Sequence, residues 1–420
     1  MPKTMNSNVQ IRVNTDLEVG SEFKKTNHRS KNEDRSEAER RRREQIEKRE
    51  YGSARSETMD DGGVIELQSE VLVLRVSTRR QLQELAKGKI STVPTRYIQS
   101  QHEELVINKD DHSILEIPII DMKKLLSLEF ENSELSKLHL ACKDWGFFQL
   151  VNHGVSSSLV EKVKLETQDF FNLPMSEKKK FWQTPKHMEG FGQAFVMSDE
   201  QKLDWADIFF MSTLPKHSRM PHLFPKLPLP IRDTFELYSM ELQKLSMVIV
   251  EYMGKALKMD ENEMRMLFED GIQSMRMNYY PPCPQPEKVI GLTPHSDGSA
   301  LTILLQLNDV QGLQVRKDGN WVPVKPLPNA FIVNIGDILE IITNGIYRSI
   351  EHRATVNSEK ERISIATFYT SKHDGEIGPA KSLINEVTPA RFKRIGLKEY
   401  LKNLFARKLD GKSFLDSLRI

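Results

Sequence analysis

The sequence predicts a mainly β protein with flanking helices, and two observations lead to this prediction. From Ser274 onward, short apolar runs are separated by turn signals such as residues 318–320 (DGN), which is typical of an antiparallel sandwich or barrel. Before that point, apolar residues recur at helical spacing, as at 157–171 and 231–259. The longest predicted helix, 231–259, is expected to back the sheet as a scaffold.

Residues 1–75 differ from the rest of the chain, because they are rich in Ser, Arg, Lys and Glu and have few aromatic residues. Such a composition cannot bury enough apolar surface to offset chain entropy, so we expect a disordered charged extension. Its basic cluster at 40–43 (RRRR) is typical either of a nuclear-localisation or nucleic-acid patch or of a solvated arm. The solvated arm is favoured, because basic clusters are common in disordered arms.

Helices and edge strands are expected over residues 80–225, followed by scaffold helices over 226–270. Pro118 cannot donate a backbone hydrogen bond, so the apolar run 115–121 is predicted to be an edge strand. Ser133 is a candidate N-cap of the helix that follows.

The β core is predicted over residues 271–373, and a mainly helical segment over 374–420, with its helical pattern at 397–418. Alternation and turn signals predict strands in the core at 274–281, 290–295, 300–306, 312–316, 321–324, 330–334, 346–356 and 362–370.

The most informative stretch is 293–298 (TPHSDG), which separates two alternating apolar runs. Residues i and i+2 of an extended segment point to the same side, so His295 and Asp297 can reach one point in space. With His352, in a later strand-like run, they complete a facial triad that binds iron(II) and leaves positions open for oxygen and a co-substrate. One H-x-D spacing is weak by itself, because a chain with 11 histidines often has one by chance.

A carboxylate clamp is predicted shortly after His352. Arg362 and Ser364 share one face of a predicted strand, and a guanidinium with a hydroxyl is suited to hold a carboxylate. A metal triad followed by such a clamp implies a keto acid that binds the metal at one end and the clamp at the other. The alternative is a surface arginine that pairs with Glu359 or Glu361.

These motifs, together with residues 275–284 (MRMNYYPPCP) and 142–154 (CKDWGFFQLVNHG), resemble the plant 2-oxoglutarate/Fe(II)-dependent dioxygenase family. The resemblance covers about residues 80–420. Residues 344–349 (NGIYRS) and 408–416 (KLDGKSFLD) bring it nearest to the branch of senescence-related oxidoreductases, codeine and thebaine O-demethylases and norcoclaurine-synthase-like enzymes.

The resemblance implies a double-stranded β-helix, a jelly-roll variant, with a helical N-terminal region. It also implies iron(II), 2-oxoglutarate and O₂, with ascorbate as reductant and release of succinate and CO₂. The expected reaction is hydroxylation or O-demethylation of a small aromatic metabolite in plant specialised metabolism. The family pattern assigns the metal to His295, Asp297 and His352, and 2-oxoglutarate to Arg362, Ser364, Asn278 and Tyr280.

The substrate pocket is expected beside the clamp. Phe368 lies in phase with Arg362 on the same predicted strand, and the resemblance assigns it to the pocket wall. The other candidates for the wall are Arg276, Thr370, Phe191 and Phe210. Arg276 and Thr370 stand where flavonoid-type relatives use other polar groups, which weakens a flavonoid assignment.

Two other classes of function remain open at this point. One is an iron enzyme of the same fold without keto-acid turnover, such as an ethylene-forming oxidase or a norcoclaurine-synthase-like condensing enzyme. The other is a non-catalytic binding module, which is disfavoured because every triad and clamp position is filled.

The overall composition limits the cellular context. A net charge of +1 argues against a general polyanion partner, so no nucleic acid is expected. Cys142 and Cys283 are too few for a disulfide framework and suit a reducing compartment. No apolar run of membrane-spanning length and no signal peptide is apparent. We expect a cytosolic monomer without membrane contact, with the nucleus as a further location.

Overall fold

The computed structural model describes residues 82–88, 90–99, 115–184, 187–193, 196, 201–407 and 411–420. The charged extension predicted over 1–75 and its basic cluster lie outside these residues. In the part of the chain that is described, no helix combines the length and the hydropathy needed to cross a membrane.

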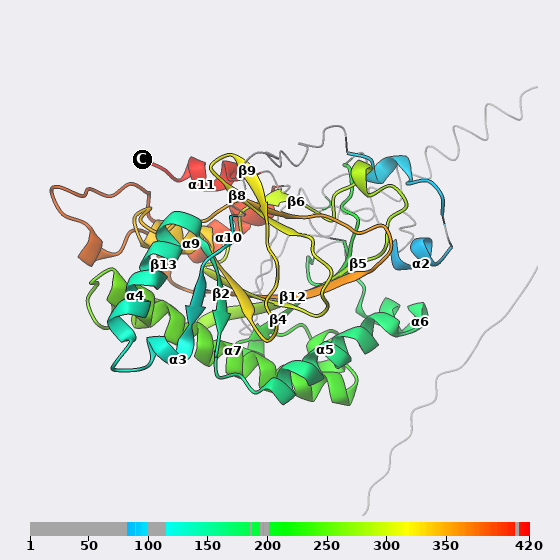
Figure 1. Cartoon of the computed structure of the whole chain (residues 1–420), viewed down its shortest axis with the longest axis horizontal. Coiled ribbons are helices and arrows are strands. Elements are labelled where there is room, and N and C mark those ends of the chain that lie inside the picture. The colour runs from blue at the N-terminus through cyan, green and yellow to red at the C-terminus, as the bar shows by residue number, and fades with distance from the viewer. Residues whose placement is uncertain are drawn as a thin grey trace, which may run out of the picture. The chain divides into compact units, whose positions relative to one another are not determined.

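Within these residues, a large and a smaller sheet form the core, which confirms the predicted mainly β, jelly-roll-like fold (Figure 1). The larger sheet has the order β1-β2-β10-β7-β12-β5-β4-β3, and the smaller has the order β6-β11-β8-β9. A separate pair, β13 and β14, lies outside both. The strands are β1 Ile119–Asp121, β2 Phe147–Val151, β3 Gly190–Gly192, β4 Asp207–Leu214, β5 Gly271–Tyr280, β6 Leu292–His295, β7 Leu301–Gln306, β8 Leu313–Lys317, β9 Asn320–Pro323, β10 Phe331–Ile335, β11 His352–Ala354, β12 Arg362–Lys372, β13 Glu376–Ile377 and β14 Ile395–Gly396.

Helices cover the larger sheet. The longest of those described, α7, contacts β4, β7 and β12 and packs against α4 and α5, so it has the scaffold position predicted for residues 231–259 (Figure 1). The helix predicted at 157–171 is also present, as α5. The helices are α2 Leu82–Lys87, α3 Met122–Leu125, α4 Glu131–Leu140, α5 Ser157–Asn172, α6 Met175–Lys178, α7 Leu229–Ala256, α8 Glu263–Phe268, α9 Asp337–Ile342, α10 Leu397–Phe405 and α11 Ser413–Ser417.

Strand alternation decides which residues of the larger sheet meet the helices and which face the smaller sheet. In β5, the residues of the helix-side core are Met275, Met277 and Tyr279, and those that line the pocket between the sheets are Arg276, Asn278 and Tyr280. In β12, Ile363 and Ile365 likewise belong to the helix-side core. The intervening positions therefore carry the polar residues of the site.

The predicted strand 346–356 is wrong over most of its length. Only His352–Ala354 forms a strand, β11, and the buried helix α9 precedes it at Asp337–Ile342. The backbone directly before the predicted run is not extended, because Asn344 and Gly345 have positive φ angles of 53° and 79°. The missed helix is only six residues long and buried on every side, including at Asp337 and Glu340, so it shows no amphipathic pattern from which to predict it.

Two other local predictions differ from the structure. Ser133 is not an N-cap, because α4 begins at Glu131 and the Ser133 hydroxyl donates to the carbonyl of Phe130 at 2.8 Å. No strand is predicted at Asp207–Leu214, where the structure has β4 paired with β5 along the pocket. Most of β4 is buried on both faces, so its apolar residues do not alternate with polar ones.

The edge strand near Pro118 is present as β1, although it is shorter than predicted. In the C-terminal segment, the predicted helix 397–418 is two separate helices, α10 and α11. The residues before them form β13, which pairs with β14.

Candidate active site

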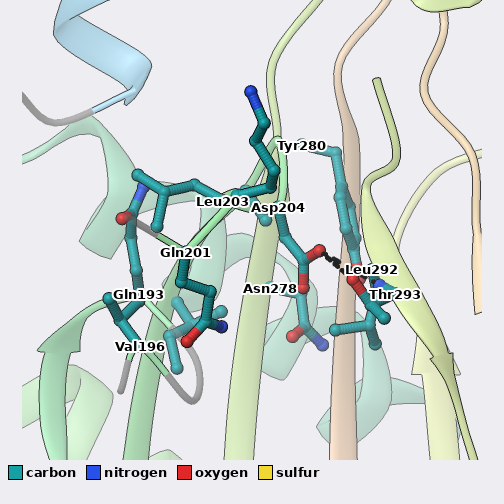
Figure 2. Close-up of a pocket in the computed structure, with 12 residues that line it drawn as sticks. Gln193, Val196, Gln201, Leu203, Asp204, Asn278, Tyr280, Leu292 and Thr293 are labelled. Carbon is teal, nitrogen blue, oxygen red and sulfur yellow. Dashed lines mark hydrogen bonds between the residues drawn. The ribbon is translucent and has the colours of Figure 1, made fainter. Parts of the chain in front are cut away.

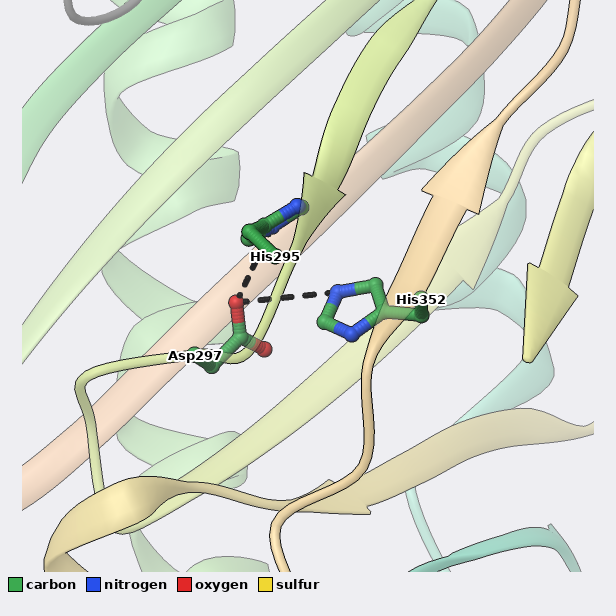
Figure 3. Close-up of side chains that lie close together, drawn as sticks. All are labelled: His295, Asp297 and His352. Carbon is green, nitrogen blue, oxygen red and sulfur yellow. Dashed lines mark ion pairs between the residues drawn. The ribbon is translucent and has the colours of Figure 1, made fainter. Parts of the chain in front are cut away.

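Three potential metal ligands meet between the sheets (Figure 3). His295 ends β6, Asp297 lies in the loop after it, and His352 begins β11, directly opposite His295 in the antiparallel pair. All three are buried, and their ligand atoms lie within 4.8 Å of one another. Asp297 Oδ1 is 3.5 Å from Nε2 of His295 and 3.7 Å from Nε2 of His352. The pairing of β6 with β11 thus brings His295 and Asp297 together with His352.

Backbone carbonyls orient both imidazoles. Nδ1 of His295 lies 2.7 Å from the carbonyl of Thr293, and Nδ1 of His352 lies 3.2 Å from that of Ile350. A carbonyl can only accept, so Nδ1 carries the proton and Nε2 offers its lone pair to the centre. Burial and the nearby His295 lower the pKa of His352 to about 4, so this ring is neutral near pH 7, as a metal ligand must be.

Asp297 is held by two side chains that sequence reasoning missed. Thr302 Oγ1 donates to Asp297 Oδ2 at 2.6 Å, and Asn334 Nδ2 donates to the same oxygen at 2.8 Å. Oδ1 is left facing the histidines. Burial opposes ionisation, but the histidines and Thr302 outweigh it and hold the pKa of Asp297 well below its usual range. The carboxylate is therefore ionised, and its Oδ1 points toward the two imidazoles.

These three residues fit an iron(II)-like ion. The set offers two imidazole nitrogens and one carboxylate oxygen, which is the facial triad of non-haem iron oxygenases. Nε2 of His295 is buried and has no hydrogen-bond partner, as expected of a nitrogen reserved for a metal.

The C-terminal segment packs on the loop that carries Asp297. Tyr400 of α10 donates to the carbonyl of Gly298 at 2.9 Å. A Cβ at Gly298 would lie 2.3 Å from Cδ2 of Leu404 of the same helix, so a larger residue there would require the Leu404 side chain to move. Because Leu397 and Tyr400 belong to the hydrophobic core, α10 ties the metal loop to that core.

Arg362 lies at one end of the pocket and is 2% exposed, which excludes the alternative of a surface arginine. It donates to Gln306 Oε1 at 3.1 Å and to Ser364 Oγ at 3.4 Å, while its Nε has no hydrogen-bond partner. A Cβ at Gly312 would lie 2.8 Å from Arg362 Cδ. A buried guanidinium with a spare donor is suited to a carboxylate ligand.

Asn278 and Tyr280 lie beside Arg362, as predicted from their shared strand face. Asn278 Nδ2 donates to Ser364 Oγ at 3.3 Å, and its Oδ1 has no partner. The guanidinium of Arg362 lies over the Tyr280 ring, 5.2 Å from its centroid. All four residues line one pocket together with Asp297 and His352.

The other end of this pocket is aromatic. Arg276 lies over the Phe368 ring at 5.4 Å, and both residues line the pocket. Phe210, which pairs with Arg276 across the sheet, has its ring 6.4 Å from that of Phe368 but is not part of the pocket lining. Thr370 is buried further along β12 and is not part of the pocket lining.

Phe191 is not brought to the pocket. It pairs with Phe209, and both rings lie in the helix-side core, where Phe191 is 6.0 Å from Phe170 and 6.4 Å from Phe171. The phase of β3 relative to β4 therefore turns Phe191 away from Phe210, a relation that the sequence alone does not contain.

A second pocket adjoins the first and shares Asn278, Tyr280 and Leu292 with it (Figure 2). Its wall includes Asp204, a carboxylate that hydrogen-bonds Thr293. Its other lining residues are Gln193, Val196, Gln201, Lys202, Leu203, Ala206 and Ile208.

A buried triad between two facing β sheets, beside a buried guanidinium, defines a non-haem iron oxygenase that uses a keto acid. Residues 271–371 match the 2OG-Fe(II) oxygenase superfamily. Residues 117–227 match a second family model, the N-terminal region of non-haem dioxygenases in morphine synthesis. The chain belongs to the 2OG-Fe(II) oxygenase superfamily and is a 2-oxoglutarate-dependent dioxygenase.

Characterised relatives cover most of the chain. It is 62% identical to Protein SRG1 of Arabidopsis thaliana over 81% of this chain and 96% of the relative. It is 58% identical to oxoglutarate-dependent flavonoid 7-O-demethylase 1 of Ocimum basilicum, over 81% of this chain and 90% of the relative. It is 56% identical to codeine O-demethylase of Papaver somniferum, over 81% of this chain and 95% of the relative.

The structure is similar to the crystal structure of JOX2 in complex with 2OG, Fe and JA, with a TM-score of 0.72 and 37% identity. The match covers 81% of this chain and 98% of that one. Iron and 2-oxoglutarate are thus the metal and co-substrate of this fold, as predicted.

Proposed function

We propose that this enzyme hydroxylates or O-demethylates a small aromatic plant metabolite. One observation carries the proposal: the pocket lined by Asp297 and His352, two of the three triad residues, is also lined by the buried Arg362 and by Phe368. The relatives support it, because two of them are named as a flavonoid 7-O-demethylase and a codeine O-demethylase.

We assign iron(II) to His295, Asp297 and His352. Iron with bound 2-oxoglutarate would supply the oxidation of a substrate C–H bond by O₂, with 2-oxoglutarate leaving as succinate and CO₂. Thr302 and Asn334 keep Asp297 aimed at the metal, so the donor set is preformed.

We assign the far carboxylate of 2-oxoglutarate to Arg362 and Ser364, with Asn278 and Tyr280 beside them. The unpartnered Nε of Arg362 and the free Oδ1 of Asn278 show that this polar set has hydrogen-bonding capacity left over. Burial strengthens an arginine–carboxylate pair because water does not compete for it.

We assign the aromatic substrate to the end of the pocket formed by Phe368 and Arg276. Phe368 offers a ring face and edge for stacking, and Arg276 can donate to a phenol, ether or carbonyl oxygen of the substrate. When the oxidised carbon belongs to a methoxy group, the hydroxylated product collapses to a phenol and formaldehyde.

Turnover of a substrate panel tests the proposal. Enzyme, iron(II), 2-oxoglutarate, ascorbate and air would be incubated with aromatic methyl ethers and alkaloids, and with the matching free phenols as controls. O-Demethylation gives equal amounts of succinate and formaldehyde, whereas hydroxylation gives succinate without formaldehyde. Failure of every aromatic compound to raise succinate above the no-substrate level would refute this substrate class.

We also propose that the enzyme acts in the cytosol. Its two cysteines, Cys142 and Cys283, are buried free thiols, which suits a reducing compartment. A fluorescent fusion of the full chain tests this location, and a second fusion without residues 1–70 tests whether the basic cluster directs any of the protein to the nucleus.

A further inference from the structure

A chain of hydrogen bonds leads from a residue outside the triad to the metal ligand His295. Asp204 Oδ1 accepts from Thr293 Oγ1 at 2.6 Å and from the Thr293 backbone N–H at 3.2 Å (Figure 2). The carbonyl of Thr293 then accepts from Nδ1 of His295 at 2.7 Å. The Asp204 carboxylate therefore accepts from both donors of Thr293, and the carbonyl of Thr293 orients the imidazole of His295.

The position of Asp204 is fixed independently of Thr293. Its neighbour Trp205 donates its backbone N–H to Ile290 at 2.7 Å and its indole N–H to the carbonyl of Pro281 at 3.1 Å. On the other side, the backbone N–H of Leu203 donates to the carbonyl of Arg96 at 3.0 Å. Asp204 is thus an anchored acceptor to which Thr293 is tied.

The three triad residues differ in the groups that hold their side chains in position. Side chains hold Asp297 directly, through Thr302 and Asn334. The His352 ring is held by the carbonyl of Ile350, two residues away in its own chain segment. For His295 the equivalent carbonyl belongs to a residue clamped by a carboxylate 89 positions away in sequence.

We propose that Asp204 is a positioning residue for the metal site. By fixing the Thr293 peptide, it keeps Nδ1 of His295 engaged and Nε2 directed at the metal, and so raises metal affinity. The inference rests on the proposed metal site. Groups that orient metal-bound histidines commonly change metal affinity about 10-fold to 100-fold when removed.

The competing explanation is that Asp204 only ties the 201–206 segment to β6 and contributes to stability. Asp207 provides a matched control for that role. It is a buried carboxylate in the same stretch of chain and accepts from the backbone N–H groups of Leu82 and Gln83 at 3.1 Å and 2.8 Å. These two hydrogen bonds lead to α2, whereas those of Asp204 lead to Thr293 and His295.

Calorimetric titration of the metal-free full chain with Co(II) tests the proposal without any turnover, and Tm is measured in parallel. Asp204→Ala should raise the Co(II) Kd about 10-fold. Asp204→Asn should raise it less than about 3-fold, because an amide oxygen can still accept both Thr293 donors. Asp207→Ala should lower Tm and leave the Kd unchanged.

Thr293→Val gives a second test if Asp204→Ala does not fold. It removes the shorter of the two hydrogen bonds to Asp204 and should raise the Kd about 3-fold, whereas Thr293→Ser should not change it. A Kd for Asp204→Ala or Thr293→Val equal to that of wild type overturns the proposal. An equal change in Asp207→Ala also overturns it.

His352→Ala separates a failure of this inference from a failure of the proposed metal site. Its loss of Co(II) binding, combined with unchanged affinity in Asp204→Ala, would reject the positioning role alone. Wild-type affinity in His352→Ala would reject the metal site itself, and the inference with it.

Discussion

The two ends of the pocket differ in how their arginines are held. Arg362 donates to Gln306 and Ser364 and is almost fully buried. Arg276 is also buried and lies over the ring of Phe368, and the Nε of each arginine has no hydrogen-bond partner. Their positions on the sheet are four residues of β5 apart, since Arg362 pairs with Tyr280. At about 3.3 Å per residue, this separates the ends by about 13 Å.

This difference matches two kinds of ligand. A co-substrate that is the same in every turnover is best held by a preformed polar site with fixed hydrogen bonds. A pocket end made of an aromatic ring and an arginine imposes shape and ring stacking, which suits a class of related substrates. Changes at one end should therefore alter the affinity for one ligand and not for the other.

The largest effect is expected where both ligands depend on the metal. Asp297→Ala removes the only anionic ligand and should abolish succinate production with every substrate. The fold should survive, because Asp297 lies in a loop outside the apolar clusters, and circular dichroism with a Tm measurement checks this. Substantial succinate production by the folded variant at ordinary iron concentrations would contradict the triad.

Arg362→Lys should give the next largest effect. Lysine keeps the charge but loses the planar fork, so the KM for 2-oxoglutarate should rise about 10-fold or more. The KM for the aromatic substrate should change much less. Steady-state rates with each ligand varied in turn measure both values, and an unchanged 2-oxoglutarate dependence would refute the carboxylate clamp.

Phe368→Leu tests the opposite end. It keeps an apolar side chain but loses the ring that contacts Arg276 and Phe210. Aromatic contacts of this kind contribute about 0.5–1.5 kcal/mol, so the KM for the aromatic substrate should rise about 2-fold to 13-fold. The KM for 2-oxoglutarate should stay at the wild-type value, and an equal rise in both constants would show that the ends are not separate.

The smallest effect is expected from deletion of residues 1–70. Their composition offers little apolar surface to bury, so Tm and both KM values should be nearly unchanged. Differential scanning calorimetry and steady-state kinetics of the shortened chain measure this. A Tm decrease of more than a few degrees would mean that the arm contributes to the folded enzyme.

Much of the site could be predicted because it follows from strand alternation. Residues two apart on β5 and β12 share a face, so Asn278 with Tyr280, and Arg362 with Ser364, are grouped by sequence alone. The two motifs that supply His295 and His352 also lie in apolar runs that are recognisable as strands, although β11 is much shorter than its run.

The remainder depends on pairings between distant segments. Thr302 and Asn334 support Asp297 only because β7 and β10 are neighbours in the sheet. Asp204 reaches Thr293 from a segment with no strand pattern of its own. The assignment of Phe191 to the pocket is wrong, because the side to which Phe191 points depends on how β3 pairs with β4. The residues of β3 alone do not show this pairing.

The separation of the two ends is tested most directly by an anaerobic titration of 2-oxoglutarate into the iron(II)-loaded enzyme. The visible charge-transfer absorption of the complex reports binding without turnover. Relative to wild type, the Kd should rise about 10-fold in Arg362→Lys and stay within about 2-fold in Phe368→Leu. An unchanged Kd in Arg362→Lys, or equal increases in both variants, would contradict the account.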